Sequence, residues 1–235
     1  MENSRSALTF VPLVPFGGPF YLTNMTAGVM KLALSWFRKG DQLMRKVTFG
    51  GASSLDNFIA RKDDTFDWIM WCKEAGEIMR DYWKTIDTIV MGRRTYEVAA
   101  RNGPLPVHKG VQTYVFSRTL QERGKKGLTF VSEDVVDFVR RLKEEDGQDI
   151  CIMGGGLLAR PLFEAGLIDE VGLNIHPILL GSGIPLFHEM SRQVDLELVK
   201  CQQLSNGCVF VLFHTKQVGQ KSTTRKSVAK RKSRG

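Results

Sequence analysis

The chain has 235 residues, of which 43% are hydrophobic, and its formal net charge at pH 7 is +8. Such a composition supports a single globular domain with a core of ordinary size. No stretch reaches the roughly 18 to 20 consecutive apolar residues that a membrane span needs, so the sequence predicts a soluble protein rather than a membrane-spanning one.

The excess positive charge belongs to one end of the chain. Residues 216–235 contain eight Lys or Arg residues and no Asp or Glu, so the rest of the chain is close to neutral. A segment this poor in apolar residues cannot offset its loss of conformational entropy by burial, and we expect a disordered tail. The tail fits a solubilising terminus, a nuclear address or nonspecific contact with nucleic acid.

Cysteine and histidine show no pattern of a metal or disulfide protein. The four cysteines have no C-x-x-C spacing, and the four histidines are scattered along the chain. We therefore expect neither a metal site nor a disulfide framework. A reducing, cytoplasmic compartment fits this pattern better than secretion.

The first 43 residues differ from those that follow. The run FVPLVPFGGPF is interrupted by prolines and a Gly-Gly pair, and the segment lacks the clean apolar run of a secretory signal. Two interpretations stay open: an organellar transit segment, or an extension upstream of a natural start at Met44. In both, the folded domain is expected over residues 44–215.

From Met44 onward the pattern alternates between strand and helix. Strand-like apolar spacing occurs at 45–52, 87–92, 111–117, 128–131 and 149–154. Helical spacing occurs at 71–86, 93–101 and 156–166, and a further helix is expected after Ser132, which would cap it. Strands that alternate with helices pair in parallel through right-handed crossovers, which places helices on both faces of the sheet.

The last part of the domain has a different character. Residues 169–181 indicate a strand and an irregular loop, and two further strand-like runs flank Ser205, Asn206 and Gly207. Asn-Gly between two such runs is a strong hairpin signal. The sequence thus predicts an α/β fold whose mostly parallel mixed sheet is closed by a C-terminal antiparallel hairpin. Sheets of this kind bind ligands at the carboxyl ends of their parallel strands.

One predicted strand end carries two cations. Gly92 ends a buried strand, and Arg93, Arg94 and Thr95 begin the following helix. Glycine lets a ligand approach the main chain closely, and a helix N-terminus offers free N–H groups. Arginines there oppose the helix dipole by about 0.3 to 1 kcal/mol each, so their presence favours a bound phosphate over a merely solvated helix end.

Two further strand ends are similar. Gly154, Gly155 and Gly156 follow another buried strand, and three consecutive glycines suit the close approach of a pyrophosphate. Ser117 and Arg118 end a third strand. Three phosphate-binding strand ends predict a phosphorylated dinucleotide, and the additional arginines favour NADPH over NADH.

Four segments, taken in order, resemble the dihydrofolate reductase-like family typified by the C-terminal reductase domain of RibD. They are GGASSLDNFIA, TIVMGRRTYE, YVFSRTL and IMGGGLLARPLFEAGLIDEVGLNIHPILLGSGIPLF, and the resemblance covers about residues 44–214. It implies a three-layer α/β/α fold, NADPH as the cofactor and a homodimer.

The resemblance also implies roles for single residues. Arg93, Ser117 and Arg118 would hold the 2′-phosphate and adenosine end, Thr95 would contact the pyrophosphate, and the glycines would carry the phosphates towards the nicotinamide. Ala52 and Ile59 would line the nicotinamide pocket. The full set expected to bind the cofactor is Ala52, Ile59, Gly92, Arg93, Arg94, Thr95, Ser117, Arg118, Met153, Gly154, Gly155, Gly156 and Leu157.

The loop after the first strand is expected to face the substrate. Its Asp56 would bind an amino-pyrimidine edge or relay a proton, which makes it the first catalytic candidate. Asn57 stands where the family has glycine, and asparagine tolerates a left-handed backbone. Glu77, on the following helix, is the second catalytic candidate. Both acids also fit ordinary surface positions, in a turn and on a helix.

Two features depart from the family pattern. The run VQTYVFS has no arginine of the kind that binds the folate glutamate, which disfavours folate as a substrate. Pro161 lies early in the helix after the glycines, where it would remove a hydrogen bond, so a late or kinked start of that helix is expected.

The reaction implied by the resemblance is hydride transfer from NADPH to a C=N or C=O group of a small heterocyclic or sugar-like substrate. Its most specific form is the reduction of 5-amino-6-(5-phosphoribosylamino)uracil in riboflavin biosynthesis. The alternative is a non-catalytic NADP(H)-binding module whose basic tail recruits a partner or nucleic acid.

Overall fold

The computed structural model describes residues 44–102, 110–120 and 127–216, and the predictions for residues 1–43 and for the tail beyond Lys216 lie outside this part of the chain. The strands and helices, in chain order, are β1 (Val47–Ser54), β2 (Phe58–Ala60), α2 (Lys73–Trp83), β3 (Ile86–Gly92), α3 (Arg93–Arg101), β4 (Gln112–Phe116), β5 (Leu128–Val131), α4 (Val135–Glu144), β6 (Asp149–Met153), α5 (Gly156–Glu164), β7 (Glu170–His176), β8 (Ile184–Pro185), β9 (Leu196–Gln203) and β10 (Val209–Thr215).

Most of the strands form one sheet of eight, in the order β5-β4-β3-β6-β1-β7-β10-β9. The pairs from β5 to β7 are parallel, whereas β10 is antiparallel to both β7 and β9. The hairpin of β9 and β10 turns at Gly207, whose φ is 84°. The predicted mixed sheet with its closing hairpin is confirmed. The small sheet of β2 and β8 was not predicted.

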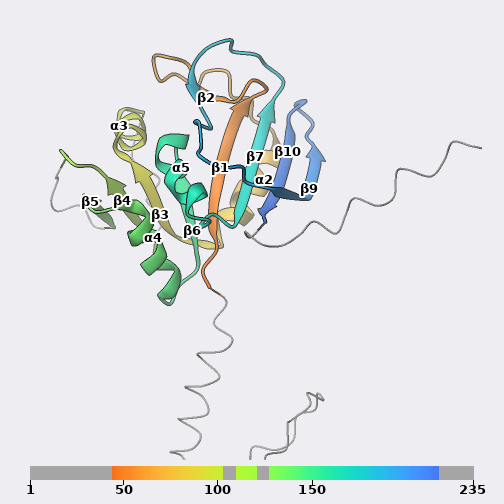
Figure 1. Cartoon of the computed structure of the whole chain (residues 1–235). Helices are drawn as coiled ribbons and strands as arrows, with labels where there is room; N and C mark the ends of the chain where they lie inside the picture. The colour runs from red at the N-terminus through yellow and green to blue at the C-terminus, as the bar shows by residue number, and fades with distance from the viewer. Residues whose placement is uncertain (1–43, 103–109, 121–126, 217–235) are drawn as a thin grey trace, which may run out of the picture. The chain divides into compact units, whose positions relative to one another are not determined.

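Helices cover both faces of the sheet, with α5 in front and α2 behind in the view of Figure 1. Helices α4 and α5 pack on the larger core, where Leu162 and Val139 lie with Phe49 and Ile152 of the sheet. On the opposite face Tyr96 of α3 packs with strand residues of a second cluster, and α2 adds a third. Burying an apolar side chain of this size stabilises the fold by about 1.5 to 3 kcal/mol. These layers confirm the three-layer α/β/α fold.

Two helix starts differ from the prediction. Helix α4 is capped by Asp134 and not by Ser132, because the Asp134 carboxylate accepts the N–H groups of Val136 at 2.8 Å and Asp137 at 3.1 Å. Helix α5 begins at Gly156, with only Gly154 and Gly155 between it and the last residue of β6, so the expectation of a late start was wrong. Pro161 lies inside the helix, where it lacks the N–H that would donate to the carbonyl of Leu157.

Two turns depend on a residue with positive φ, and the one at Asn57 was predicted. Gly166 has φ 68° and ends α5, where the N–H of Leu167 donates to the carbonyl of Leu162 at 2.9 Å, as in a Schellman cap. Asn57 has φ 64° and so adopts the left-handed conformation that the turn after β1 requires. No helix in the described ranges is both long and apolar enough to cross a membrane.

Candidate cofactor and substrate site

Strands β1 and β6 separate before they reach the carboxyl edge of the sheet. β1 pairs with β6 only over Val47–Phe49, but it stays paired with β7 as far as Ser54. The carbonyl of Lys46 accepts the N–H of Ile150 on the β6 side, and main-chain groups alternate in direction along a strand. The N–H and C=O groups of Ala52 therefore face the opening between β1 and β6.

Two helices with uncapped N-termini begin at the same edge. Helix α3 follows β3 through Gly92, and α5 follows β6 through Gly155, and neither first turn has a side-chain cap or an acidic residue. By contrast, the side chains of Cys72 and Asp134 cap α2 and α4. The free N–H groups and the dipoles of α3 and α5 favour an anion at both ends.

These two helix starts lie side by side. A Cβ atom built on Gly154 would fall 2.1 Å from the hydroxyl oxygen of Thr95. The strands that precede them are neighbours, with Met91 opposite Met153. The arginine pair and the three glycines thus share one edge of the sheet.

The glycines at this edge are required for different reasons. Gly154 has φ 118° and no room beside Thr95, and a Cβ on Gly156 would lie 2.5 Å from the carbonyl oxygen of Leu186. Two of the three consecutive glycines are thus needed by the packing of the chain itself, whether or not a ligand binds there. At Gly155 the nearest obstacle is the end of the Ile59 side chain at 3.4 Å, and at Gly92 nothing lies within 4 Å.

The three arginines predicted to bind phosphate are not equivalent. Arg93 is 54% exposed, and its Nε lies 3.7 Å from Oε1 of Glu97 in a loose surface pair. Its Nη1 donates to the Thr119 hydroxyl at 3.3 Å, which joins the start of α3 to the turn after β4. Arg118, in that turn, is exposed. The guanidinium of Arg94 instead binds Asp64, with 2.8 Å between Nε and Oδ1. Arg93 and Arg118 are therefore better placed for an added phosphate than Arg94.

The remaining predicted cofactor residues surround the same edge. Ser117 is buried, and its hydroxyl oxygen accepts the N–H of Leu120 at 2.8 Å, which orders the turn and leaves the hydroxyl proton free to donate. Met153 ends β6, partly buried, and Leu157 in the first turn of α5 is 68% exposed. Ile59 of β2 lies next to Gly155.

Asp56 holds two loops together. Its carboxylate accepts the Ser54 hydroxyl at 2.6 Å and the N–H groups of Leu180 at 3.1 Å and Gly181 at 2.7 Å. The hydrogen bond from Ser54, followed by those from the two amides, lowers the pKa of Asp56 below its ordinary value, although partial desolvation opposes them. An ionised carboxylate with these partners is suited to positioning the loop after β1, not to donating a proton.

Glu77 lies on an exposed part of α2. Its carboxylate is 48% exposed and 3.8 Å from the ammonium of Lys73, one helical turn earlier. The contact is a surface pair of the ordinary i,i+4 kind, which contributes little to stability. The structure does not bring Glu77 into contact with any other predicted site residue within the described ranges.

Sequence reasoning missed a buried polar group beside β1. Asn174 lies opposite Ala52, its amide nitrogen is 3.3 Å from Nε2 of His176, and the ring of Trp68 meets that imidazole edge-on at 5.2 Å. Nδ1 of His176 accepts the N–H of Met70 at 3.3 Å, and burial lowers the pKa of the ring, so the imidazole is neutral. Polar residues alternating within the apolar run GLNIH were the available signal.

Two atoms of this group lack a partner among the described residues: the indole nitrogen of Trp68 and the side-chain oxygen of Asn174. An unpaired buried polar atom is unfavourable by about 1 to 3 kcal/mol. The side-chain oxygen of Asn174, on the strand paired with Ala52, could accept a hydrogen bond from a polar ligand or from water. No group of three or more His, Cys, Asp or Glu side chains within the described ranges is arranged to hold a metal ion.

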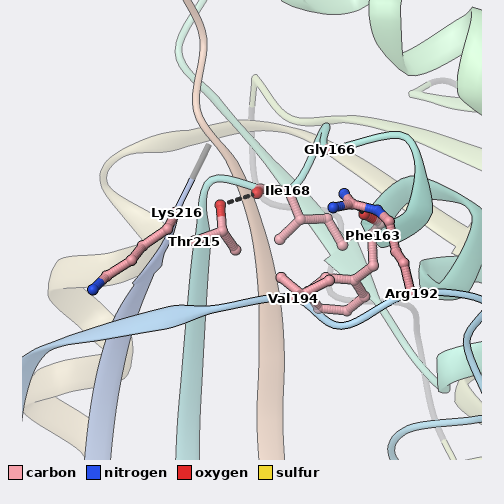
Figure 2. A pocket seen from close by; sticks show the side chains of 7 residues that line it. All are labelled: Phe163, Gly166, Ile168, Arg192, Val194, Thr215 and Lys216. Atoms are coloured by element: carbon pink, nitrogen blue, oxygen red, sulfur yellow. Dashed lines mark hydrogen bonds between the residues drawn. The ribbon is translucent and has the colours of Figure 1, made fainter. Parts of the chain in front are cut away.

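A small pocket at the opposite edge of the sheet is not part of this site. Figure 2 shows Arg192 over the C-terminal end of α5, where its guanidinium donates to the carbonyl of Phe163 at 2.7 Å, and the Thr215 hydroxyl bonded to the carbonyl of Ile168. These contacts cap a helix and join the start of β7 to the end of β10. The pocket is a feature of packing.

Comparison with known proteins identifies relatives of this chain. The chain is 35% identical over 160 residues to the uncharacterized protein YwjB of Bacillus subtilis, covering 68% of this chain and 92% of YwjB. It is 25% identical over 198 residues to the riboflavin biosynthesis protein RibD of Corynebacterium ammoniagenes, covering 77% of this chain and 57% of RibD.

Solved structures share the architecture. A Shewanella sp. PV-4 protein named for riboflavin biosynthesis matches with a TM-score of 0.65 and 25% identity, over 73% of this chain and 99% of that one. A deaminase/5-amino-6-(5-phosphoribosylamino)uracil reductase of Thermotoga maritima matches with a TM-score of 0.55 at 17% identity, over 80% of this chain and 62% of that one. The dihydrofolate reductase of Enterococcus faecalis, complexed with NADP(H), matches with a TM-score of 0.54 at 18% identity. The match covers 73% of this chain and 97% of that one.

A family model also matches this chain. The model of the RibD C-terminal domain covers residues 45–210, from the start of β1 to within β10, and so includes every element that forms the edge described above. The chain belongs to the RibD C-terminal domain family.

Proposed function

We propose that the protein is an NADPH-dependent reductase that transfers a hydride to a small heterocyclic or sugar-like substrate. Family membership and reductase neighbours support a reductase-type oxidoreductase of the riboflavin-biosynthesis kind and suggest a nicotinamide cofactor. The T. maritima neighbour is named for 5-amino-6-(5-phosphoribosylamino)uracil reduction, and that compound is the first substrate to test.

The observation that carries the proposal is the contact of Thr95 with Gly154. It brings two uncapped helix N-termini to one edge, where each suits one phosphate of a pyrophosphate. Arg93 and Arg118 flank the start of α3 and match the 2′-phosphate of NADPH. Open space over Gly92 leaves the main chain accessible to such a group.

Hydride transfer from NADPH requires little catalysis by side chains. When bound, NADPH supplies the hydride that reduces a C=N or C=O carbon, while the nitrogen or oxygen takes a proton from solvent. The N–H and C=O groups of Ala52 offer a donor and an acceptor to an amide such as the nicotinamide carboxamide. Ile59 and Ala52 provide apolar surface that excludes water from the ring. Asp56 fixes the loop between β1, which carries Ala52, and β2, which carries Ile59.

Cofactor titration tests the proposal. The parent protein should bind NADPH at least about tenfold more tightly than NADH, because a charge-assisted hydrogen bond to a phosphate contributes about 1.5 to 3 kcal/mol. Arg93→Ala should remove most of that preference and leave NADH binding unchanged. Arg94→Ala is the matched control, because its guanidinium binds Asp64, and it should keep the preference. Equal affinity of the parent for NADPH and NADH would contradict the phosphate assignment.

Turnover is measured separately, by loss of NADPH absorbance in the presence of 5-amino-6-(5-phosphoribosylamino)uracil and related pyrimidines and sugars. Oxidation of NADPH with one of them supports a reductase. Tight NADPH binding with no oxidation across the panel would favour a non-catalytic binding module instead.

The homodimer expected from the family remains a proposal, and strand β9 is its best support. β9 is an edge strand exposed along nearly its whole length. Leu198 is 57% exposed and Val199 is 48% exposed, which leaves apolar side chains and unpaired main-chain groups at the end of the sheet. An edge of this kind is suited to pairing with a second copy.

A further inference from the structure

The polar group on β7 lies directly beside the strand that the proposed function gives to the nicotinamide. Asn174 is the register partner of Ala52, so the two side chains project from the same face of the sheet. Both residues are partly exposed, which leaves this stretch of the face open to a ligand. The other members of the group, His176 and Trp68, are buried. A ligand that contacts Asn174 therefore lies next to Ala52.

The hydrogen bonds of His176 decide which of its ring nitrogens carries the proton. Nδ1 accepts the main-chain N–H of Met70 at 3.3 Å, so this nitrogen has no proton of its own. The thiol of Cys208 lies 3.3 Å from the same nitrogen and can donate to it as well. The proton of the neutral imidazole is then on Nε2, which is a donor. The ring therefore requires an acceptor opposite Nε2.

That requirement decides the orientation of the Asn174 amide. With its nitrogen 3.3 Å from Nε2 of His176, the amide would set two N–H donors against each other. A half-turn of the amide exchanges its oxygen and nitrogen, and the hydrogen-bond partners select between the two orientations. With the oxygen turned towards Nε2, the imidazole is satisfied. The NH2 group then takes the position that has no partner among the described residues, so Asn174 offers a ligand a donor rather than an acceptor.

Trp68 contributes a second donor to the same group. Its indole nitrogen, which can only donate, has no partner among the residues that the structure describes. Its ring meets the ring of His176 edge-on, with 5.2 Å between the centroids, and the whole residue is only 7% exposed. Buried donors without a partner are unfavourable, so a ligand that brings an acceptor gains hydrogen bonds that the protein alone does not make.

We propose that Asn174 and Trp68 bind a carbonyl oxygen of the substrate, and that His176 is the positioning residue that turns the Asn174 NH2 group towards it. The inference rests on the proposed function, because NADPH beside Ala52 is what makes this ligand a hydride acceptor. Two donors suit the carbonyl group of a ketone, an aldehyde or a cyclic amide such as a pyrimidinone ring. A ring with amino groups in the same places is rejected, because donor would face donor.

Two small pyrimidines test the donors without turnover. 6-Aminouracil presents ring carbonyls, and 2,4,6-triaminopyrimidine has amino groups in their places. Each is titrated into the full-length protein with and without NADP⁺, at a pH where both probes are uncharged, and the indole N–H signals are followed by proton–nitrogen NMR. 6-Aminouracil should bind at least about tenfold more tightly, because only its oxygens can accept from both donors.

The indole signals report the contact with Trp68 itself. The chain has four tryptophans, and Trp68→Phe identifies the signal of Trp68 by its loss. That signal should shift when 6-aminouracil binds, and Trp68→Phe should weaken the binding about fivefold or more. Trp71→Phe is the matched control, because its side chain is 71% exposed, and it should leave the affinity unchanged.

Asn174→Asp exchanges the free donor for an acceptor and keeps an oxygen opposite Nε2 of His176. The preference should therefore reverse, with 6-aminouracil bound about tenfold or more weakly than by the parent. Asn102→Asp makes the same change at the end of α3, where the amide donates to the carbonyl of Val98, and should leave both affinities as in the parent. The preference of the parent between the two probes tests the inference even if Asn174→Asp does not fold.

The proton on His176 gives a separate measurement. Nitrogen NMR of the ring should show Nε2 protonated and Nδ1 unprotonated, with the signals identified by their loss in His176→Gln. A proton on Nδ1 would overturn the inference, and so would equal or tighter binding of 2,4,6-triaminopyrimidine by the parent. An unchanged Trp68 signal at saturating 6-aminouracil would also overturn it, because water alone would then be the partner of the indole.

The two proposals fail in different ways. If 6-aminouracil is preferred and shifts the Trp68 signal but no substrate oxidises NADPH, the two donors stand as a carbonyl-binding site and the reductase proposal is wrong. If 5-amino-6-(5-phosphoribosylamino)uracil oxidises NADPH but the parent prefers 2,4,6-triaminopyrimidine, the reductase stands and the inference on Asn174 and Trp68 is wrong.

Discussion

The hydroxyl of Thr95 occupies the space that a side chain on Gly154 would need. This contact fixes the first turn of α3 against the strand-to-helix junction of α5. Both helix ends are uncapped, so each can bind an anion. The packing of Thr95 against Gly154 sets the distance between these two ends. We therefore expect the proposed pyrophosphate site to be preformed in the free protein.

A methyl group added at Gly154 should disturb the proposed cofactor site more than a methyl group added at Gly155. Gly154→Ala meets Thr95 and also forces alanine to φ 118°, so we expect a loss of stability of about 1 to 3 kcal/mol and a fall in NADPH affinity of about tenfold or more. Gly155→Ala is the matched control, because only the flexible end of Ile59 is near. Thermal melts and cofactor titration of both variants measure the difference. Equal effects would contradict the steric argument.

Replacing Asp56 should loosen the loop after β1 in a pH-dependent way. Its pKa is lowered in the folded state, so its hydrogen bonds stabilise the fold above the unfolded pKa, and this contribution is lost as the pH falls through the folded pKa. Asp56→Asn should lower Tm at pH 7, because its amide cannot accept from both Leu180 and Gly181. The Tm gap to the parent should close as the pH approaches the lowered pKa.

Asp56 should contribute no limb to the pH–rate profile of turnover. An ionised Asp56 that only positions the loop contributes no titration between about pH 5 and 8. A pH–rate limb in that range that disappears in Asp56→Asn would restore Asp56 as an acid catalyst.

Buried His176 predicts acid sensitivity. Burial lowers the pKa of His176 below 6.5 in the folded protein. As the pH falls, the imidazole is therefore protonated in the unfolded chain before it is protonated in the folded one. Stability should therefore fall as the pH drops below about 6.5 towards the folded pKa. The slope of Tm between pH 7 and pH 5 should be smaller in His176→Gln than in the parent.

A charge on β9 should separate a dimer. Leu198→Lys places an ammonium group on the exposed edge strand and touches no part of the cofactor edge. We expect sedimentation to show monomers for this variant, or a dissociation constant raised at least about tenfold, with NADPH affinity unchanged. A parent protein that sediments as a monomer would remove the dimer proposal.

Much of the fold followed from local patterns in the sequence. Helix α3 over Arg93–Arg101 and the hairpin at Gly207 were predicted because each depends on neighbouring residues. The order of the strands was not predicted, and neither was the pairing of β2 with β8, which joins segments far apart in the chain. Periodicity reports which residues are buried and says nothing about which strand lies next to which.

The site was predicted in outline and not in its internal contacts. The sequence shows which strand ends carry glycine or arginine. It does not show that Arg94 forms an ion pair with Asp64, which lies in a loop 30 residues earlier in the chain. Asn174 and His176 were overlooked because a polar residue in a strand gains meaning only from its neighbour on the next strand. Side-chain partners of this kind are set by tertiary packing.

The opening between β1 and β6 presents the backbone of Ala52, a group common to every amino acid. Main-chain recognition of a cofactor carboxamide there would survive changes of side chain. Substitutions in the surrounding loops could therefore alter the choice of substrate and leave the contact with the cofactor in place.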